Sequence, residues 1–561
     1  SWMSAHAYPD ESADTIIVEK DHRLIVSDVR RQKGLIVRGV LVIVATGELN
    51  TSQGNNGLRV EPDGVVENSG LLSGAPESVL FTAGSRYRHL HADREGVIPM
   101  ATWDPASVLE ISGFTSAVQA SVAGNWGQDF GHVEWNTPSL TGDFILNGLL
   151  RSVGGDFRIL NTGGKVLRLA WQENLILRVG GDLDIRGGRF SVSKAGPVNS
   201  SVVVDIGRDF LFRSTDPLGS RICEQGVSAF SVHRDFKMDG GLMYFSSGSG
   251  GSSNSGGDLR VAGDFFLNGG TLDASVAYSN RVGDLFFTGN QEQHFYNRGA
   301  IIGSFNYRLA SGSIVRIPDG HWMPGNNLEV GDASGGATLV VMSTDPAGAI
   351  QKTQTATGNL RVRTQTWRSG STIVYGGDQA QFIGSDHPSG TGLTCVIRNP
   401  AGVSVSTAGT TVVCGGDLSV QAGELRIAAN NLTIRKDLRT AGGTVRLSAL
   451  GLTSTRTLTI DGSFIPATQD LSVESDPINN GGNALLVFGG DFNGTGSMIF
   501  NGPNCQVQVN GAARIFSRPF PITGPITLES LTLNAPVSLI VNKPLTLGNY
   551  TASTAAWTGG V

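Results

Sequence analysis

The segment Gly154–Ile159 reads GGDFRI, and close variants of this phrase follow it at regular intervals. The variants are GGDLDI at residues 180–185, GRDFLF at 207–212, HRDFKM at 233–238 and GDFFL at 263–267. Their aspartates are Asp156, Asp182, Asp209, Asp235 and Asp264, and the steps between them are nearly equal. A fixed period of this size is typical of solenoid proteins, in which each repeat forms one turn of the chain.

Each repeat has the pattern of one coil of a β-solenoid, made of short strands, and not the pattern of a helix. Apolar and polar residues alternate after the aspartate, which indicates a strand. Glycine pairs such as 163–164 and 187–188 then turn the chain, because glycine enters backbone conformations that strain other residues. One turn cannot bury its apolar side alone, so stability comes from stacking. The sequence therefore predicts an all-β fold, a parallel β-solenoid (β-helix) with about 26 residues per turn and about twenty turns.

The composition fits this fold and excludes some functions. Glycine supplies 77 of 561 residues and charged residues only 16%, whereas ordinary domains hold roughly 7% glycine and about 25% charged residues. The formal net charge of −6 and the lack of a basic stripe argue against a nucleic-acid partner. No apolar run of eighteen residues occurs, so we expect no membrane span.

Shifts in the repeat pattern predict five regions. These are capping coils at residues 1–75, irregular loop-rich coils with tryptophans at 76–140, regular Gly-Gly-Asp coils at 141–283, a second solenoid module at 284–415 and a third at 416–561. The phrase continues in the later modules as GGD at 415–417, RKDL at 435–438 and GGDF at 489–492. No leader is recognised at the start and no finishing element at the end, so we expect a processed protein or a piece of a longer one.

The repeated aspartates are the most regular candidate site. If Asp156, Asp182, Asp209, Asp235 and Asp264 stack in register, neighbouring carboxylates about 5 Å apart repel by roughly 1 kcal/mol even in water-like surroundings. We expect backbone N–H groups at the glycine turns and neighbouring cations to offset this repulsion. The alternative is Ca²⁺ bridging the carboxylates, since oxygen-rich turns suit that ion. Apart from calcium at these aspartates, no cofactor is expected.

The four cysteines are too few to cross-link the chain. The separation of Cys395 and Cys414 in the sequence is close to one short turn, so they could occupy neighbouring rungs. They then form a disulfide in an oxidising compartment, or serve as two small buried apolar residues. Cys223 and Cys505 are interpreted as isolated core residues, and no cysteine spacing resembles a zinc site.

Two groups in the irregular region are further candidates. His89, His91 and Asp93 alternate on an expected loop, where they offer metal ligands or form a solvated polar segment. Three tryptophans stack on sugar rings if they are exposed, or pack beneath loops if they are buried. They are Trp103, Trp126 and Trp135.

Several short phrases together resemble a known class of proteins. They are VIPMATWD at residues 97–104, FGHVEWN at 130–136, the Gly-Gly-Asp turns, FTGN at 287–290 and LTLN at 531–534. This combination resembles the repetitive β-solenoid regions of very large secreted surface proteins of Bacteroidota. The resemblance implies type IX secretion with a C-terminal sorting domain, and a role as an adhesin or filament component. No sorting domain is recognised in the sequence, and the resemblance carries no functional residue over to this chain.

Two classes of function remain open. The first is an extracellular structural or adhesive rod or filament on the bacterial cell surface, not an enzyme, that self-associates and attaches to surfaces, glycans or other cells. The second is a polysaccharide-acting β-helix enzyme or a phage-type receptor-binding spike. An enzyme of this kind needs a groove with carboxylates roughly 5 to 10 Å apart beside exposed aromatic residues.

Overall fold

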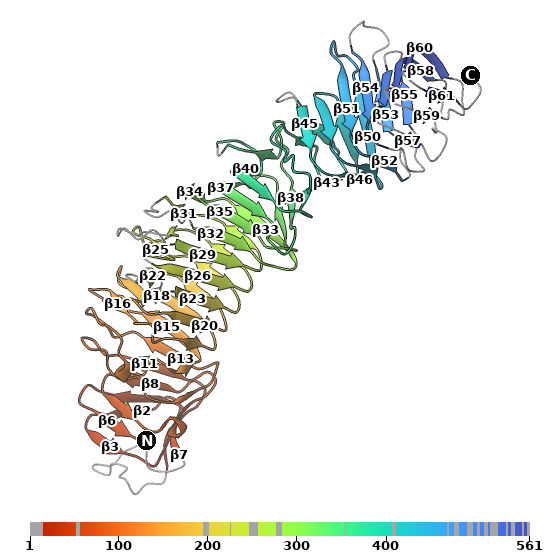
Figure 1. The fold of residues 1–561 in the computed structure, drawn as a ribbon. Helices are drawn as coiled ribbons and strands as arrows, with labels where there is room; N and C mark the ends of the chain where they lie inside the picture. The colour runs from red at the N-terminus through yellow and green to blue at the C-terminus, as the bar shows by residue number, and fades with distance from the viewer. Residues whose placement is uncertain are drawn as a thin grey trace. The chain divides into compact units, whose positions relative to one another are not determined.

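A computed structural model describes the chain as two units, Ser1–Phe286 with Arg298–Phe305 and Phe287–Asn297 with Asn306–Val561. The described residues are 15–51, 56–193, 201–224, 226–245, 256–275, 283–353, 355–406, 411–467, 471–475, 482–490, 498–501, 505–509, 514–515, 526–533, 537–539, 545–552 and 555–557. Within each unit the strands stack in parallel as successive rungs (Figure 1).

The predicted fold is confirmed. The described chain is nearly all parallel β and makes about 17 solenoid turns spaced about 24 residues apart, slightly fewer and shorter turns than expected. In the described part of the chain, two short 3₁₀ helices, η1 (Pro76–Ser78) and η2 (Val122–Gly124), interrupt the strands. Among the described residues, no helix has the length and apolar character needed to cross a membrane.

In the first unit, one continuous face carries the repeated aspartates, and we call it the ladder face. Its strands are β2 (Arg23–Val26), β5 (Val40–Ile43), β8 (Val65–Asn68), β11 (Arg86–His89), β13 (Val108–Ile111), β15 (His132–Asn136), β18 (Phe157–Asn161), β21 (Leu183–Ile185), β24 (Phe210–Phe212), β27 (Phe236–Met238) and β30 (Phe265–Leu267). The parallel pairing continues through residues 76–140, where the sequence loses its period, with one register shift between Trp135 and Asn136. The turns there are shorter, since Tyr87 pairs with Leu109 whereas Leu183 of the regular coils pairs with Phe210.

Two further faces complete each turn of the first unit. The second face holds β14 (Asp129–Phe130), β17 (Ser152–Val153), β20 (Leu175–Val179), β23 (Ser201–Ile206), β26 (Val227–Val232) and β29 (Gly256–Val261), preceded by β1 (Ile16–Val18), β4 (Gly34–Val37), β7 (Asn56–Val60), β10 (Val79–Phe81) and β12 (Thr102–Trp103). The third face holds β16 (Phe144–Ile145), β19 (Val166–Ala170), β22 (Arg189–Ser193), β25 (Ser220–Arg221), β28 (Leu242–Tyr244), β31 (Thr271–Ala274) and β34 (Ala300–Gly303), preceded by β3 (Val29–Arg31), β6 (Glu48–Asn50) and β9 (Leu71–Ser73). The expected N-terminal cap also involves residues 1–14, which lie outside the described part of the chain.

The second unit has the same construction, but the length of its turns varies more, as the pairings of Thr338 with Thr372 and of Leu418 with Leu438 show. Its longest ladder runs through β33 (Glu292–Asn297), β36 (Ile314–Ile317), β38 (Thr338–Val341), β41 (Thr372–Tyr375), β43 (Thr394–Arg398), β46 (Leu418–Ala422), β49 (Leu438–Thr440) and β52 (Phe464–Pro466). A second ladder contains β42 (Gln381–Ile383), β44 (Val403–Val405), β47 (Glu424–Ile427), β50 (Thr444–Ser448), β53 (Leu471–Glu474) and β55 (Met498–Asn501). A third contains β45 (Thr411–Cys414), β48 (Asn431–Ile434), β51 (Arg456–Ile460), β54 (Ala484–Phe488), β56 (Cys505–Val509), β58 (Ile526–Leu533) and β60 (Leu545–Ala552). The pairing of Leu418 with Leu438 gives one of its short turns.

The remaining strands of the second unit belong to two other sheets. They are β35 (Asn306–Leu309), β37 (Met323–Val330), β40 (Leu360–Trp367) and β39 (Ile350–Gln351), and β57 (Arg514–Ile515), β59 (Val537–Leu539) and β61 (Ala555–Trp557).

The core lies inside the stack and repeats from rung to rung. Phe210, Phe236 and Phe265 pair in register on consecutive rungs and are all buried. Their rings lie 5.4 Å and 5.1 Å apart, centre to centre. Stacked aromatic side chains add packing energy beyond the area that they bury. The alternation read from the sequence therefore corresponds to the inward and outward sides of each strand.

Glycine is required at the corners for two different reasons. Gly188 has φ +76°, a left-handed conformation that favours glycine. A Cβ atom added to Gly181 would overlap the carboxylate of Asp156 on the preceding turn. The glycine pairs thus both turn the chain and let neighbouring turns approach closely.

Candidate functional site

The repeated aspartates form a hydrogen-bonded ladder along one corner of the first unit. The Oδ1 atom of Asp156 accepts a hydrogen bond from the backbone N–H of Asp182 at 2.9 Å. Asp182 accepts one from Asp209 at 3.1 Å, Asp209 one from Asp235 at 3.1 Å, and Asp235 one from Asp264 at 2.9 Å. Each carboxylate therefore caps the backbone of the next turn, which confirms the expected N–H contacts.

Cations bridge the same carboxylates across turns. Arg208 contacts Asp156 at 2.6 Å and Asp182 at 3.2 Å, and Lys237 contacts Asp209 at 3.3 Å and Asp235 at 2.8 Å. Burial alone would raise the pKa of Asp156, but the N–H of Asp182 and the guanidinium of Arg208 outweigh it and hold that pKa below its ordinary value. These contacts offset the repulsion without a metal ion, and the calcium interpretation stays a prediction.

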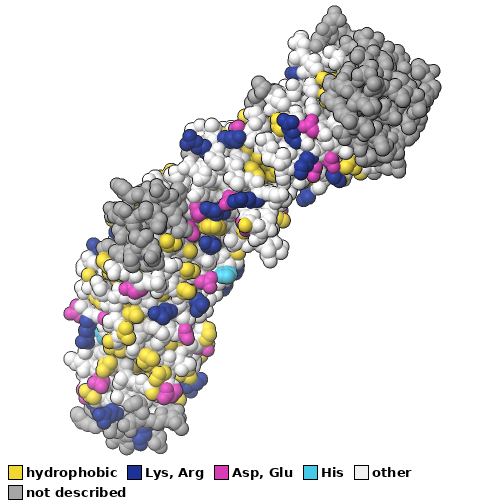
Figure 2. All heavy atoms as spheres, viewed as in Figure 1, with side chains coloured by type: hydrophobic (Ala, Val, Ile, Leu, Met, Phe, Trp, Pro, Cys, Tyr) yellow, Lys and Arg dark blue, Asp and Glu magenta, His cyan; other side chains and the backbone are white. Residues whose placement is uncertain are grey.

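The charged network extends beyond the aspartates onto the ladder face. Arg86 contacts Glu110 at 2.8 Å and Glu134 at 2.5 Å, and Arg158 contacts Glu134 at 3.0 Å and Asp156 at 2.5 Å. Burial opposes ionisation of Glu134, but its two arginine partners hold its pKa below the ordinary value. Figure 2 shows acidic and basic side chains lying among one another on the visible surface of this unit.

The same capping recurs in the second unit. The Oδ1 atom of Asp417 accepts a hydrogen bond from the N–H of Asp437 at 3.1 Å, and Asp437 accepts one from the N–H of Ser463 at 2.9 Å. The last position of this ladder only has to donate a backbone N–H, so Ser463 can stand there in place of an aspartate.

The predicted glycan-contact tryptophans do not face solvent. Trp103 is 7% exposed, and Trp126 and Trp135 are 1% exposed each. The ring of Trp103 stacks on Phe81 with centroids 4.2 Å apart, and the ring of Trp126 lies 6.2 Å from that of Trp135. Of the two alternatives for these tryptophans, burial beneath the loops is the one that the structure shows, and contact with sugars is not supported, because the rings fill the interior of the turns between residues 81 and 144.

Polar partners satisfy the indole groups inside this cluster. The indole N–H of Trp126 donates to the Oε1 atom of Glu95 at 2.8 Å, and that carboxylate also accepts from the hydroxyl of Ser121 at 2.5 Å. The indole N–H of Trp135 donates to the hydroxyl of Thr137 at 2.9 Å. The role of this region is therefore packing beneath the loops.

The histidines of the alternating triplet are also interior residues. His89 and His91 are buried with their rings 4.5 Å apart, whereas Asp93 is exposed, so the three do not offer ligands on one face. Burial lowers the pKa of His89 to about 3 and that of His91 to about 4. Nε2 of His89 contacts the carbonyl oxygen of Glu95 at 2.6 Å. Neither ring nitrogen of His91 has a hydrogen-bond partner among the described residues.

A pocket of about 590 Å³ lies beside the tryptophan cluster. Glu173 is the one acidic residue among the described residues that line it, and Gln119, Asn147 and Trp171 also line it. The carboxylate of Glu173 accepts backbone N–H bonds from Trp171 at 2.8 Å and Gln172 at 3.1 Å. One carboxylate held in this way does not make the acid and base pair that glycoside hydrolysis needs.

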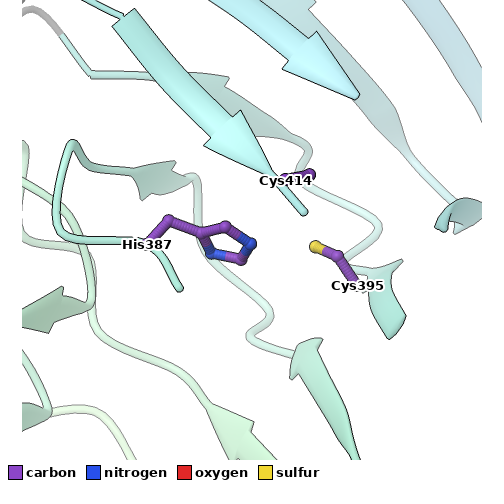
Figure 3. A group of neighbouring side chains, drawn as sticks. All are labelled: His387, Cys395 and Cys414. Atoms are coloured by element: carbon purple, nitrogen blue, oxygen red, sulfur yellow. The ribbon is translucent and has the colours of Figure 1, made fainter. Parts of the chain in front are cut away.

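A different group of chemically competent side chains lies inside the second unit. His387, on the loop after β42, faces Cys395 of β43 and Cys414 at the end of β45 (Figure 3). One potential ligand atom of each residue lies within 4.8 Å of those of the other two. Within the described part of the chain, this is the one group of three or more His, Cys, Asp or Glu side chains that could hold a metal ion.

The group is enclosed by the turn that carries it. His387 is 4% exposed and each cysteine 1%. The Nδ1 atom of His387 lies 3.0 Å from the hydroxyl oxygen of Tyr375, while its Nε2 atom is buried without a hydrogen-bond partner. The contact between the thiols lowers the pKa of Cys414 and raises that of Cys395, since one negative charge is more easily accommodated than two.

The predicted relation between the two cysteines is corrected by the structure. Cys395 pairs along its ladder with Ile373 and Leu418, and Cys414 pairs with Ile434, so the two do not occupy neighbouring rungs of one sheet. They meet across the interior from different sheets, and both thiols are free. Glycines make this approach possible, because a Cβ atom at Gly416 would overlap the carbonyl oxygen of Leu393.

Nothing in the sequence singled out His387 as a member of this group. Its spacings to Cys395 and to Cys414 do not belong to a common metal-binding motif. The other two cysteines, Cys223 and Cys505, are both buried, as expected of core residues. Comparisons with protein-family models, with curated proteins and with solved structures found no significant match to this chain.

Proposed function

We propose that this chain is an extracellular structural or adhesive β-solenoid of the bacterial cell surface, and not an enzyme. The observation that carries the proposal is the charged network of the ladder face. Its carboxylates are engaged across turns by arginine, lysine and backbone N–H groups, as Glu134 is by Arg86 and Arg158. Groups held in this way stabilise a stack of turns and are poorly suited to move protons.

The arrangement of aromatic residues supports the same proposal. A carbohydrate-cleaving groove needs accessible rings next to a pair of free carboxylates. In the first unit the rings of Trp103, Trp126 and Trp135 are buried, and the described lining of the pocket beside them has a single acidic residue. The partly exposed ring of Trp171 also lines that pocket, but Glu173 is the one carboxylate in its described lining, so an acid and base pair is not completed there.

We infer further that copies of the chain associate into a rod or filament that holds surfaces, glycans or other cells. Parallel turns present unpaired N–H and C=O groups at any uncovered end, which favours association between copies. The resemblance to secreted Bacteroidota surface proteins supports an extracellular location and export by type IX secretion.

Negative-stain imaging of the protein purified from its native cell surface tests this proposal. We expect filaments or end-to-end arrays of the chain, and binding to cells or surface glycans that leaves the glycans intact. Monodisperse single chains that release sugars from a polysaccharide panel would overturn it. The variant Glu173→Gln separates the cases, since it alters the single acidic residue of the pocket and should leave both assembly and attachment unchanged.

A further inference from the structure

We propose that His387, Cys395 and Cys414 form a buried binding site for one thiophilic metal ion of the Zn²⁺ or Cu⁺ class. This proposal does not rest on the proposed surface function, because the three side chains are buried inside the second unit and the proposed surface function does not use them. Its three donor atoms already lie within 4.8 Å of one another, so a central ion would need only small side-chain rotations to contact all three.

The imidazole is held by a neighbouring residue in the way metal-binding histidines usually are. Its Nδ1 atom lies 3.0 Å from the hydroxyl oxygen of Tyr375, which is completely buried. With Nδ1 carrying the proton and donating to that oxygen, the lone pair is on Nε2. Nε2 is also the buried nitrogen without a hydrogen-bond partner, and ligation to an ion would satisfy it.

The donor set selects the class of metal. Two sulfur atoms and an imidazole nitrogen suit Zn²⁺ and Cu⁺, whereas Ca²⁺ and Mg²⁺ require oxygen ligands. Binding of Zn²⁺ converts both thiols to thiolates and releases two protons, which leaves a site with no net charge. A neutral site is favoured in an interior where an unpaired charge is costly. Cu⁺ also binds two thiolates and an imidazole, but the site then carries one net negative charge.

The surroundings match a site built for an ion. The loop that carries His387 packs onto the glycine pair 415–416, where a Cβ atom would overlap the carbonyl oxygens of Ser389 and Leu393. The strand of Cys395, β43, pairs with β41 on one side and β46 on the other, and the strand of Cys414, β45, pairs with β48. The three donors are therefore positioned by three separate elements, one packed loop and two paired strands.

Titration of the reduced, metal-free full chain with Co²⁺ tests the proposal. We expect one equivalent to bind with the sulfur-to-cobalt charge-transfer absorption of thiolate ligation, and Zn²⁺ to displace it.

Cys395→Ser and Cys414→Ser should abolish this absorption, and His387→Asn should weaken binding strongly. Tyr375→Phe should weaken it about 10- to 100-fold. The double variant Cys223→Ala/Cys505→Ala keeps only the two cysteines of the site and should bind as the unmodified chain does.

Competition with chelators selective for Zn²⁺ and for Cu⁺ then decides which ion of the class is preferred. X-ray absorption of the loaded unmodified chain should show two sulfur and one nitrogen neighbours, a readout that stands even where a variant fails to fold. The proposal is overturned if the reduced chain takes up no thiophilic ion, if the serine variants bind as well as the unmodified chain, or if Cys395 and Cys414 form a disulfide in the presence of Zn²⁺.

Discussion

Asp182 and Asp209 belong to successive turns, yet the Oδ1 atom of Asp182 accepts a hydrogen bond of 3.1 Å from the backbone N–H of Asp209. A side chain of one turn is thereby joined to the backbone of the next at the same corner. The same bond is repeated above and below, so the register of the whole corner is fixed by side chains as well as by strand pairing.

Replacing Asp209 should destabilise the first unit. Asp209→Ala removes the acceptor of the Asp235 N–H and the ion pairs with Lys237 and Arg234. We expect a loss of about 1–3 kcal/mol in the free energy of unfolding, because these groups lose a partner at a buried carboxylate. Urea denaturation followed by circular dichroism measures it. Asp378→Ala, at an exposed aspartate of another Gly-Gly-Asp phrase, is the control; equal losses for both would contradict the capping role.

Two neighbouring residues of β20 test which side of the strand faces the core. Leu177 is completely buried and Ile176 is 53% exposed. Leu177→Asp places a charge in the apolar interior and should lower the free energy of unfolding by several kcal/mol, whereas Ile176→Asp should change it by less than about 1 kcal/mol. Thermal unfolding of both variants gives the comparison. Similar melting temperatures would show that the inward side of the strand has been assigned wrongly.

Acid should destabilise the first unit through its buried histidines. The pKa of His91, lowered by burial and by Arg94, is about 4, compared with an ordinary value of 6.5. The unfolded chain therefore binds more protons between these values, so stability falls as the pH drops from about 6.5 to about 4.

Replacement of His91 isolates this effect. His91→Leu removes the buried ring nitrogens that have no hydrogen-bond partner. Relative to the unmodified chain, the variant should gain about 2 kcal/mol of stability on going from pH 7.5 to pH 5. Urea midpoints at the two pH values measure the gain. A constant difference between the two proteins would mean that His91 is accessible to protons in the folded chain.

The tryptophans should affect stability before they affect attachment. Trp135 is 1% exposed and packs 4.7 Å from the ring of Phe144. Trp135→Ala should cost about 3–5 kcal/mol, as is usual for a large core residue. Trp171→Ala, at a partly exposed ring that lines the pocket, should cost less. Glycan binding that disappears in a fully folded Trp135 variant would argue against its purely structural role.

The fold and the ladder could be predicted because their contacts repeat with the turn. Inward apolar residues, glycine corners and capping aspartates recur on many rungs, so each of these signals appears many times in the sequence. The aspartates at 156, 182 and 209 are consecutive examples. The shorter turns of residues 76–140 hid this repetition, although the same ladder of strands continues there.

Contacts that occur once left no such pattern. The burial of Trp126 depends on Glu95, which lies on another loop earlier in the chain. The approach of His387 to Cys395 and Cys414 depends on three elements that belong to different parts of two turns. The expectation of neighbouring rungs for the cysteines considered only the turn length, and it neglected that two sheets meet across the interior.

The ladder has a consequence for how such a chain changes in evolution. Each rung presents one N–H to the rung before it and one carboxylate to the rung after it, so a duplicated rung inserted between two others would find both of its partners ready. The step from Asp235 to Asp264 is longer than the step from Asp209 to Asp235, yet both carry the same hydrogen bond, so extra residues are tolerated between the fixed corners. Gene duplication and small insertions can therefore lengthen or decorate the array while each corner keeps its geometry.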